Sequence, residues 1–468
     1  MTFLRRYLPA AVVASLALGA AEPPVRWVVP SGFDPKRPAL GLPALPGVSH
    51  EVIYAPVPSR AAIESGGDGR YESALHGTYN HHTRAVRFGD KVIVYWTNHS
   101  DDENGPGQRI VARWGILDAA QGRIDWGDPA ARTVELASAP VPVHRRVPLE
   151  ATGFDRRYVR GDLRVIEGRL RFDGGFMLNQ GWTDDPRFRM RAGEPVPEER
   201  FRAVPDADEA HARERIYRYD MFWTLGPTFR QLWEFTGGAL VPASALHLQT
   251  DPPASLALTA TQRLALPALL PPYGKAPKVA EAAPALRALL ERVPPAEAAR
   301  PHYAPGTSPL AADGRNALAH RAEFRRRDGT WVILRDNLAR RGHYYAAAAR
   351  AGEAYPPAVV TNLYGDVMPA AGELPDGRVW VLGNSIGRFD FFLTLSDDGT
   401  TFDRSWHVLH INEPWREGFA KPPRGGPQYP HVLTIGNALW VFYSIGKERI
   451  GVTRIPFSSL APAAAVAP

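Results

Sequence analysis

The sequence predicts an all-β protein assembled from repeated hairpins, and three observations support this fold class. The first is a hairpin over residues 77–100, in which apolar and polar residues alternate before a turn at Gly89-Asp90, and a β-branched and aromatic strand follows. The second is its recurrence, with an Asp-Gly or Gly-Asn turn and a tryptophan in the second strand, at residues 322–337, 368–384 and 431–444. The third is a weaker copy at residues 163–172 around Glu167-Gly168.

Hairpins separated by several tens of residues are typical of β-propeller blades, in which four-stranded sheets pack around a central channel. A series of β-sandwich domains would contain the same hairpins but would need no common spacing, so the propeller is favoured. The strand at residues 450–456 lacks an evident local partner. We therefore expect it to close the ring against an early strand, which makes residues 22–468 a single domain.

One region departs from the hairpin pattern. Residues 184–303 are rich in Pro, Ala, Arg and Glu, and we interpret them as a partly helical insertion after the second or third blade. A short helix is expected from Leu286 onward and ends before Pro294-Pro295. Residues 216–225 and 231–235 still have the pattern of strands. Insertions of this kind usually cover one rim of a propeller and shape its cleft.

The N-terminus has the layout of a cleaved secretory signal. Arg5-Arg6 precede an apolar stretch, and small residues end at Ala21, so we expect a signal peptide over residues 1–21 and a periplasmic or secreted mature protein. The apolar stretch is too short to span a bilayer, and no later segment is long enough for a membrane helix.

Composition narrows the possible chemistry and partners. The chain has 0 cysteines, which excludes disulfides, thiolate metal ligands and thiol nucleophiles. The formal net charge is +6, but the basic residues are dispersed rather than gathered in a stripe or a recognisable motif. This pattern disfavours a nucleic-acid partner and fits an acidic polysaccharide or oligosaccharide better.

The hairpins also predict a functional site, because residues opposite their turns emerge at one mouth of a propeller channel. Folding the first hairpin at Gly89-Asp90 should place His82 and His99 side by side, and two imidazoles there suggest acid–base chemistry. A histidine at a strand end is more often a hydrogen-bonded structural residue, which is the favoured interpretation for His81 or His431 alone. The other polar residues expected at this mouth are Asn98, Arg335, Asn337, Asp366, Asn384, Arg388, Gln428, Tyr429 and Lys447.

Several segments resemble bacterial sialidase-like seven-bladed propellers, a group that includes ulvan lyases and enzymes that cleave rhamnose from glucuronic acid. These segments are residues 80–82, 96–99, 105–109, 428–431 and 443–448. Residues 395–402 also resemble the aspartate-box turn of sialidase-type propellers, which concerns the fold only.

The resemblance implies seven blades and two catalytic histidines at the positions of His82 and His99. It also implies a tyrosine and an arginine that act on the uronic acid, for which the candidates are Tyr364, Tyr429, Arg335 and Arg388. No cofactor is required by the sequence. The acidic loop at residues 101–103 could hold a structural cation, although such residues are usually only solvated.

The chemistry of a uronic acid agrees with these residue types. β-Elimination needs a base for the C5 proton, a cation for the carboxylate and an acid for the leaving oxygen, and His, Arg and Tyr supply these. The expected mouth contains no evident pair of carboxylates, which a conventional glycosidase would use. A polysaccharide lyase is therefore preferred. An α-L-rhamnosidase or sialidase-type hydrolase, and a non-catalytic glycan-binding propeller with Trp96 and Trp182 in its groove, remain alternatives.

Overall fold

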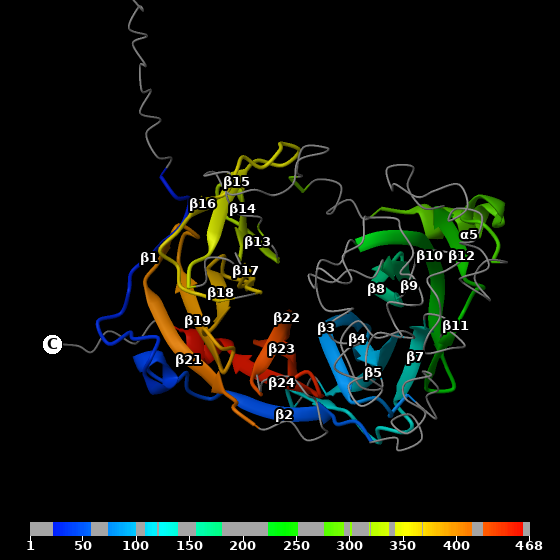
Figure 1. Ribbon diagram of the computed structural model, residues 1–468, viewed down its shortest axis with the longest axis horizontal. Coiled ribbons are helices and arrows are strands. Elements are labelled where there is room, and N and C mark those ends of the chain that lie inside the picture. Colours follow the sequence, from blue (N-terminus) through cyan, green and yellow to red (C-terminus); the bar gives the residue numbers. More distant parts are fainter. Residues whose placement is uncertain are drawn as a thin grey trace, which may run out of the picture.

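The computed structural model describes residues 22–57, 74–99, 108–118, 121–138, 156–179, 223–250, 276–293, 300–301, 318, 320–336, 342–366, 368–413 and 425–461. These residues form five sheets of four or five strands, arranged as a ring around a central space (Figure 1). The resemblance implied seven blades, and the five described sheets do not confirm that number.

Each sheet is named here by its innermost strand. The β3 sheet contains β3 (Tyr79–Phe88), β4 (Lys91–His99), β5 (Arg109–Asp118), β6 (Arg123–Asp125) and β7 (Thr133–Ser138). The β8 sheet contains β8 (Arg156–Ile166), β9 (Arg169–Asn179), β10 (Trp223–Thr236), β11 (Ala239–Pro242) and β12 (His247–Thr250). The β13 sheet contains β13 (Arg321–Arg325), β14 (Trp331–Arg335), β15 (Tyr345–Ala349) and β16 (Val359–Val360).

The remaining sheets follow the same order. The β17 sheet contains β17 (Ala370–Glu373), β18 (Val379–Asn384), β19 (Asp390–Ser396) and β21 (Arg404–His410). The β22 sheet contains β22 (Pro427–Ile435), β23 (Ala438–Ile445), β24 (Arg449–Pro456) and, from the other end of the chain, β2 (Ser49–Tyr54). A further parallel pair joins β1 (Arg26–Trp27) to β20 (Thr401–Phe402).

The pairing of β24 with β2 confirms that the C-terminal strand meets an early strand. This strand also has a local partner in β23, which the sequence did not reveal. All five predicted hairpins are present, and the strands of each pair antiparallel. In the aspartate-box turn, Asp398 accepts hydrogen bonds from the backbone N–H groups of Thr400 and Thr401, at 2.6 and 2.9 Å, and Phe402 is buried.

The expected insertion is only partly an insertion. Residues 223–250 provide β10, β11 and β12, which belong to the β8 sheet. The predicted helix is confirmed as α5 (Pro284–Glu291) and buries Leu290 against Leu232 and Val279. Short 3₁₀ helices are η1 (Pro38–Gly41), η5 (Val279–Glu281) and η6 (Phe457–Leu460).

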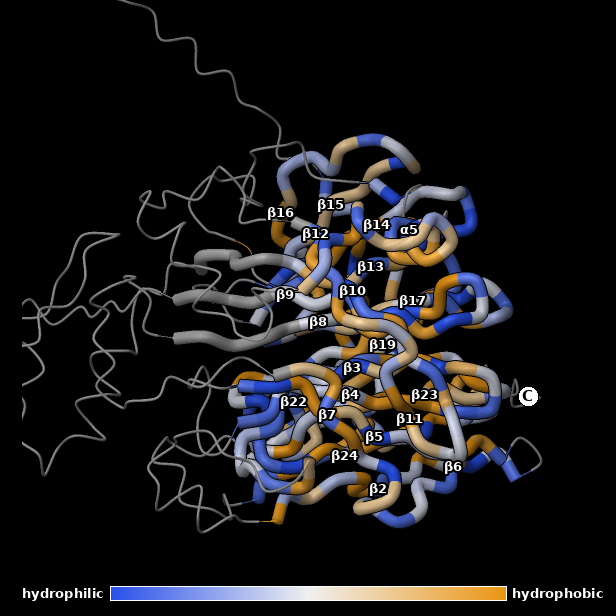
Figure 2. The backbone as a smooth tube through the Cα atoms, turned by 90° about the vertical axis from the view of Figure 1, so that its right-hand side faces the viewer, coloured by the Kyte–Doolittle hydropathy of each residue, from blue (hydrophilic) through white to orange (hydrophobic). Residues whose placement is uncertain are grey.

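The hydrophobic core lies between neighbouring sheets. Tyr95 and Trp114 of the β3 sheet pack with Phe229 of the β8 sheet, while Trp96 on the other side packs with Phe442 of the β22 sheet. Similar clusters join the β17 sheet to the β22 and β13 sheets. A side view shows the hydrophobic stretches along the strands (Figure 2). This face-to-face packing leaves the first strand of every sheet facing the centre of the ring.

Candidate active site

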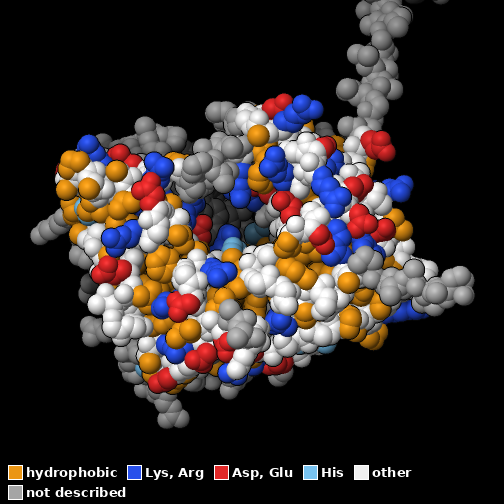
Figure 3. All heavy atoms as spheres, turned by 180° about the vertical axis from the view of Figure 1, so that it is seen from behind, with side chains coloured by type: hydrophobic (Ala, Val, Ile, Leu, Met, Phe, Trp, Pro, Cys, Tyr) orange, Lys and Arg blue, Asp and Glu red, His pale blue; other side chains and the backbone are white. Residues whose placement is uncertain are grey.

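The centre of the ring contains a cavity of about 1700 Å³. Its lining includes the inner strands of all five sheets, and the β3, β8, β13 and β22 sheets contribute histidine, tyrosine or arginine side chains. Seen from behind, the surface is hollowed at this point, with blue and pale blue side chains at its centre (Figure 3). A cavity that collects charged, histidine and tyrosine side chains from four separate sheets is the candidate active site.

A hydrogen-bonded chain of three residues crosses from the β13 sheet to the β22 sheet. Nδ1 of His320 lies 2.9 Å from Oδ2 of Asp336, and Nε2 of the same ring lies 3.3 Å from the hydroxyl oxygen of Tyr429. The buried Asp336 also accepts the backbone N–H groups of His320 at 2.6 Å and Met368 at 3.0 Å. Because the carboxylate accepts from Nδ1–H, the lone pair of Nε2 faces Tyr429 and can take its proton.

Two further histidines contact Tyr429 from the β3 sheet. The ring centroids of His81 and His82 lie 4.1 and 4.4 Å from that of Tyr429. Burial, together with the neighbouring charges of His82 and Lys447, holds the pKa of His81 well below its usual range. His81 Nδ1 is 2.6 Å from the Ser444 hydroxyl oxygen. His81 is thus a neutral structural residue, as expected for it alone, whereas His82 lines the cavity.

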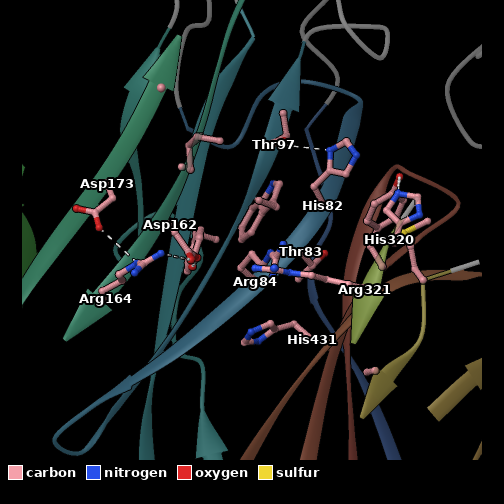
Figure 4. Close-up of a pocket in the computed structure, with 18 of the residues that line it drawn as sticks. His82, Thr83, Arg84, Thr97, Asp162, Arg164, Asp173, His320, Arg321 and His431 are labelled. Atoms are coloured by element: carbon pink, nitrogen blue, oxygen red, sulfur yellow. Dashed lines mark hydrogen bonds and ion pairs between the residues drawn. The ribbon is translucent and has the colours of Figure 1, made fainter. Parts of the chain in front are cut away.

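The cavity is strongly basic. Its lining includes seven arginines, at positions 84, 164, 171, 230, 300, 321 and 335, against three acids, Asp162, Asp173 and Glu323. Arg84 is exposed, and within the described residues no carboxylate forms an ion pair with it. In the close-up it lies between Asp162 and Arg321 (Figure 4). Such a lining favours an anionic ligand.

His431 lies below Arg84 in the same cavity (Figure 4). Burial, with a smaller contribution from the positive charge of Arg84, lowers the pKa of His431 to about 4. Its Nδ1 accepts the backbone N–H of Ala85 at 3.2 Å. The ring is therefore neutral at neutral pH, and its remaining hydrogen is on Nε2.

A pair of carboxylates lies on the opposite wall, where the sequence offered no evident pair. Asp162 and Asp173 are register partners on β8 and β9, and Arg164 lies 3.6 and 3.4 Å from their carboxylates. Asp173 also accepts from Arg171 at 2.6 and 2.8 Å. Tyr95 donates its hydroxyl hydrogen to Asp162. Asp173 is consequently held by ion pairs with arginines, and Asp162 is the carboxylate that is more available for acid–base chemistry.

Three of the eight site residues expected from the sequence line this cavity, namely His82, Tyr429 and Arg335. Arg335 is buried and donates from Nη2 to the carbonyl oxygen of Leu318 at 2.9 Å. Its neighbour in sequence, Asp336, accepts from His320.

His99 does not lie opposite His82. The ladder between β3 and β4 pairs His99 with Tyr79, and a register shift follows between His81 and Arg84. His82 therefore approaches Thr97, with Nδ1 and Oγ1 separated by 3.4 Å, while His99 is buried and is not part of the cavity lining. Counted back from Phe88 and Lys91 at the turn, even an unbroken register would pair His82 with Thr97, so the side-by-side arrangement was wrong by two residues. The bulge only moves the partner of His99 from Asn80 to Tyr79.

The other four expected residues lie outside the cavity lining, where they hydrogen-bond within the fold. Asn98 accepts from Arg109 at 2.7 Å, and Asn384 donates to the carbonyl of Pro427 at 2.7 Å. The hydroxyl of Tyr364 accepts the backbone N–H of Ile386 at 3.1 Å. Arg388 donates to Oε1 of Gln428 at 2.9 Å.

His320 and Asp336 were absent from the expected set, although the sequence contains the signal that places them together. Arg321 pairs with Arg335 at the open end of the β13–β14 hairpin, so the residues just beyond them face each other. Asp162 and Arg164 were also missed, because they belong to the weakest of the five hairpins.

Within the described ranges, no group of three or more His, Cys, Asp or Glu side chains is arranged to hold a metal ion. The acidic loop at 101–103, Asn337 and Trp182 lie outside the described residues, as does the expected signal peptide. Among the helices of the described part, none is long and apolar enough to cross a membrane.

No protein-family model matches the chain. No curated protein matches it either. Among solved structures, a protein titled "Sialidase" is 14% identical with a TM-score of 0.56, over 92% of this chain and 35% of that one. A mutant Trypanosoma rangeli sialidase with trans-sialidase activity is 9% identical over 90% of this chain and 60% of that one, with a TM-score of 0.36. A glycosyl hydrolase from Bacteroides ovatus is 10% identical over 92% and 98%, with a TM-score of 0.35. At such identities the first likeness shows the fold alone: the chain has a sialidase-like propeller fold.

Proposed function

We propose that the protein is a carbohydrate-active enzyme, a polysaccharide lyase that cleaves a uronic-acid-containing glycan by β-elimination. The observation that carries the proposal is the chain of Asp336, His320 and Tyr429 at the edge of a basic cavity. It supplies a proton-transfer group, and the arginines supply the countercharge for a uronate. The expected signal peptide accords with a polysaccharide met outside the cytoplasm.

In the proposed reaction Tyr429 is the base. As its hydroxyl proton passes to Nε2 of His320, its oxygen takes the C5 proton of the uronate, and Asp336 stabilises the imidazolium that results. The electron pair of the C5–H bond forms the C4–C5 double bond while the C4–O bond breaks. His82, whose ring packs against that of Tyr429, enters this step protonated and donates that proton to the leaving oxygen. The proton gained by His320 is afterwards released to solvent, and His82 takes up another. Arg84 pairs with the substrate carboxylate and stabilises the charge that develops on it.

This assignment replaces the expected pair of His82 and His99 with His82 and Tyr429. The reason is geometric: the side chains of His82 and Tyr429 line the cavity, whereas His99 is buried within the β3–β4 ladder.

A glycoside hydrolase is the second candidate, because Asp162 and Asp173 are direct cross-strand neighbours. Directly opposed residues have Cβ atoms about 5 Å apart, close to the carboxylate separation of retaining glycosidases. Two features oppose it. Asp173 is held by Arg171, and burial followed by the charge of Asp162 raises the pKa of Tyr95 far above its ordinary value, which disfavours a tyrosinate nucleophile.

The deciding experiment is incubation with a panel of glucuronate-containing glycans while both ultraviolet absorbance and reducing ends are followed. A lyase produces an unsaturated uronate that absorbs, and Tyr429→Phe should abolish the signal while Asp162→Asn retains it. New reducing ends without absorbance, lost in Asp162→Asn, would establish the hydrolase instead. Binding without either product would leave a non-catalytic glycan-binding propeller.

A further inference from the structure

A second, smaller cavity lies between the β3 and β22 sheets, at the turn ends of their hairpins. It has a volume of about 410 Å³ and includes Arg87, Gly122, Asn437, Trp440 and Arg454 in its lining. Arg87 follows His82 by five positions along β3, which at about 3.3 Å per residue places it roughly 15 to 20 Å from the acid–base cluster. The cavity is therefore separate from the candidate active site.

Charge distinguishes this cavity from an ordinary crevice. Its lining includes two arginines, the exposed Arg87 and the half-buried Arg454, and no carboxylate. Within the described residues neither arginine forms an ion pair, and Nε of Arg454 is buried without a hydrogen-bond partner. Two like charges that share a concave site without a countercharge repel each other, and a bound anion removes that cost.

Both side chains are held in place before any ligand arrives. Nε of Arg87 donates to the carbonyl of Gly89 at 3.1 Å. The guanidinium carbon of Arg454 lies 5.9 Å from the centre of the Trp440 ring, and its Nη2 lies 3.4 Å from Oδ1 of Asn437. A Cβ atom at Gly122 would approach Nη2 of Arg454 to 3.3 Å, so the turn fits closely around this group. Fixed donors bind an oxyanion at a lower entropic cost.

We propose that this cavity is an accessory site for an oxyanion on a sugar, namely the carboxylate of a uronate in the same glycan chain. Planar guanidinium groups suit carboxylate and sulfate oxygens, and the volume is that of a small-ligand site. The anion site stands on the two arginines, whereas the identity of the anion as a uronate rests on the proposed function. A second contact on one chain raises the affinity for long substrates without any change in the reacting groups.

The experiment titrates the ¹⁵N-labelled protein with sodium glucuronate, sodium sulfate or glucose while the tryptophan indole signals are recorded. Trp440→Phe assigns the relevant signal. Glucuronate and sulfate should both shift the Trp440 signal, and glucose should leave it unchanged. Arg87→Gln and Arg454→Gln should each weaken glucuronate binding about tenfold, the equivalent of one charge-assisted contact of about 1.4 kcal/mol.

Arg123→Gln is the matched control, because Arg123 is an exposed arginine of the neighbouring strand β6, 3.8 Å from Asp118, and lies outside the cavity lining. It should bind like the wild type. An unchanged Trp440 shift in the double variant Arg87→Gln/Arg454→Gln, or an equal shift with glucose, would overturn the accessory site. A shift with sulfate but none with glucuronate would overturn the uronate assignment. Failure of the proposed lyase reaction is seen separately, in the product assay.

Discussion

His82 and Tyr429 occupy equivalent positions in neighbouring inner strands, and both have a left-handed backbone, with φ of 57° and 55°. In β3 the register shifts between His81 and Arg84, and in β22 it shifts between Gln428 and His431, so each residue lies in a bulge. Met368, just before β17, has φ of 51°. Non-glycine residues in this conformation cost about 1 to 3 kcal/mol each and are concentrated at functional sites, which supports this location for the chemistry.

Because the backbone of His82 is strained, substitutions at this position can separate an effect on stability from an effect on activity. We expect His82→Gly to be more stable than His82→Ala by about 1 kcal/mol, because glycine adopts a positive φ without steric cost. Both variants should lose turnover by about two to four orders of magnitude, the usual effect of removing an acid–base group. Chemical denaturation and the product assay measure the two effects. Near-normal turnover in either variant would remove His82 from the mechanism.

Removal of a single oxygen atom tests Tyr429. Tyr429→Phe keeps the ring contacts with His81 and His82 but loses the hydroxyl that faces His320, so we expect turnover to fall by about two to four orders of magnitude with little change in thermal stability. Tyr364→Phe should retain most of the activity, because the Tyr364 hydroxyl contacts the Ile386 backbone outside the cavity lining. Equal losses in the two variants would contradict a specific role for Tyr429.

His99 should behave as a structural residue. It is buried opposite Tyr79, so His99→Ala should lower the free energy of unfolding by about 2 kcal/mol, in the range for truncation of a buried side chain. Turnover measured well below the melting temperature should fall less than tenfold. A catalytic loss as large as that of His82→Ala, in a variant of unchanged stability, would restore the pairing of the two histidines.

The low pKa of His431 predicts how stability depends on pH. Its pKa is about 4 in the folded protein and close to 6.5 in an unfolded chain, so the unfolded state binds a proton first as the pH falls. The stability that this neutral histidine contributes is present above pH 6.5 and is lost between pH 6.5 and about 4. Between pH 7 and pH 5 we expect a loss of about 1 to 2 kcal/mol from this group.

Urea denaturation at pH 7 and pH 5 checks this expectation, with His431→Gln as the matched variant. The variant should lose less stability over that interval, because glutamine does not titrate. His81, whose pKa is also lowered, contributes in the same direction in both proteins and leaves the difference between them intact. Identical pH dependence in the two proteins would show that His431 titrates normally.

Arg84→Lys tests the proposed carboxylate contact. Lysine keeps the positive charge but loses the planar pair of donors, so we expect kcat/KM to fall about tenfold, through both a higher KM and a lower kcat. Arg123→Lys, at an exposed arginine outside the cavity lining, should leave both constants near their wild-type values. A wild-type KM in Arg84→Lys would indicate that another arginine of the cavity binds the substrate carboxylate.

The hairpins were predictable from sequence because their signals are local. Gly89-Asp90 and Glu167-Gly168 lie at the turns that their residue types indicate. The bulge at His82 was not predictable in this way, since it depends on a neighbouring sheet: the backbone N–H of Asn80 donates to the carbonyl of Lys447 at 2.6 Å. Tyr429 meets His320 only because of how the β13 and β22 sheets are placed relative to each other, and no local sequence pattern indicates that placement. The contact between His320 and Asp336, by contrast, could have been predicted from the register of the hairpin that lies between them.

The pairing of β2 with β24 has a consequence for biosynthesis. Residues 49–54 are among the first described residues to be synthesised, and their partners at 449–456 are among the last. During translation the four other sheets can form in sequence order, while β2 has no strand to pair with until β24 has been synthesised. The β22 sheet is therefore completed only after β24 has been synthesised, and a contact of such long sequence separation makes this step slow. A chain truncated before β24 would expose β2 and β23 as unpaired edges, which are sites of aggregation.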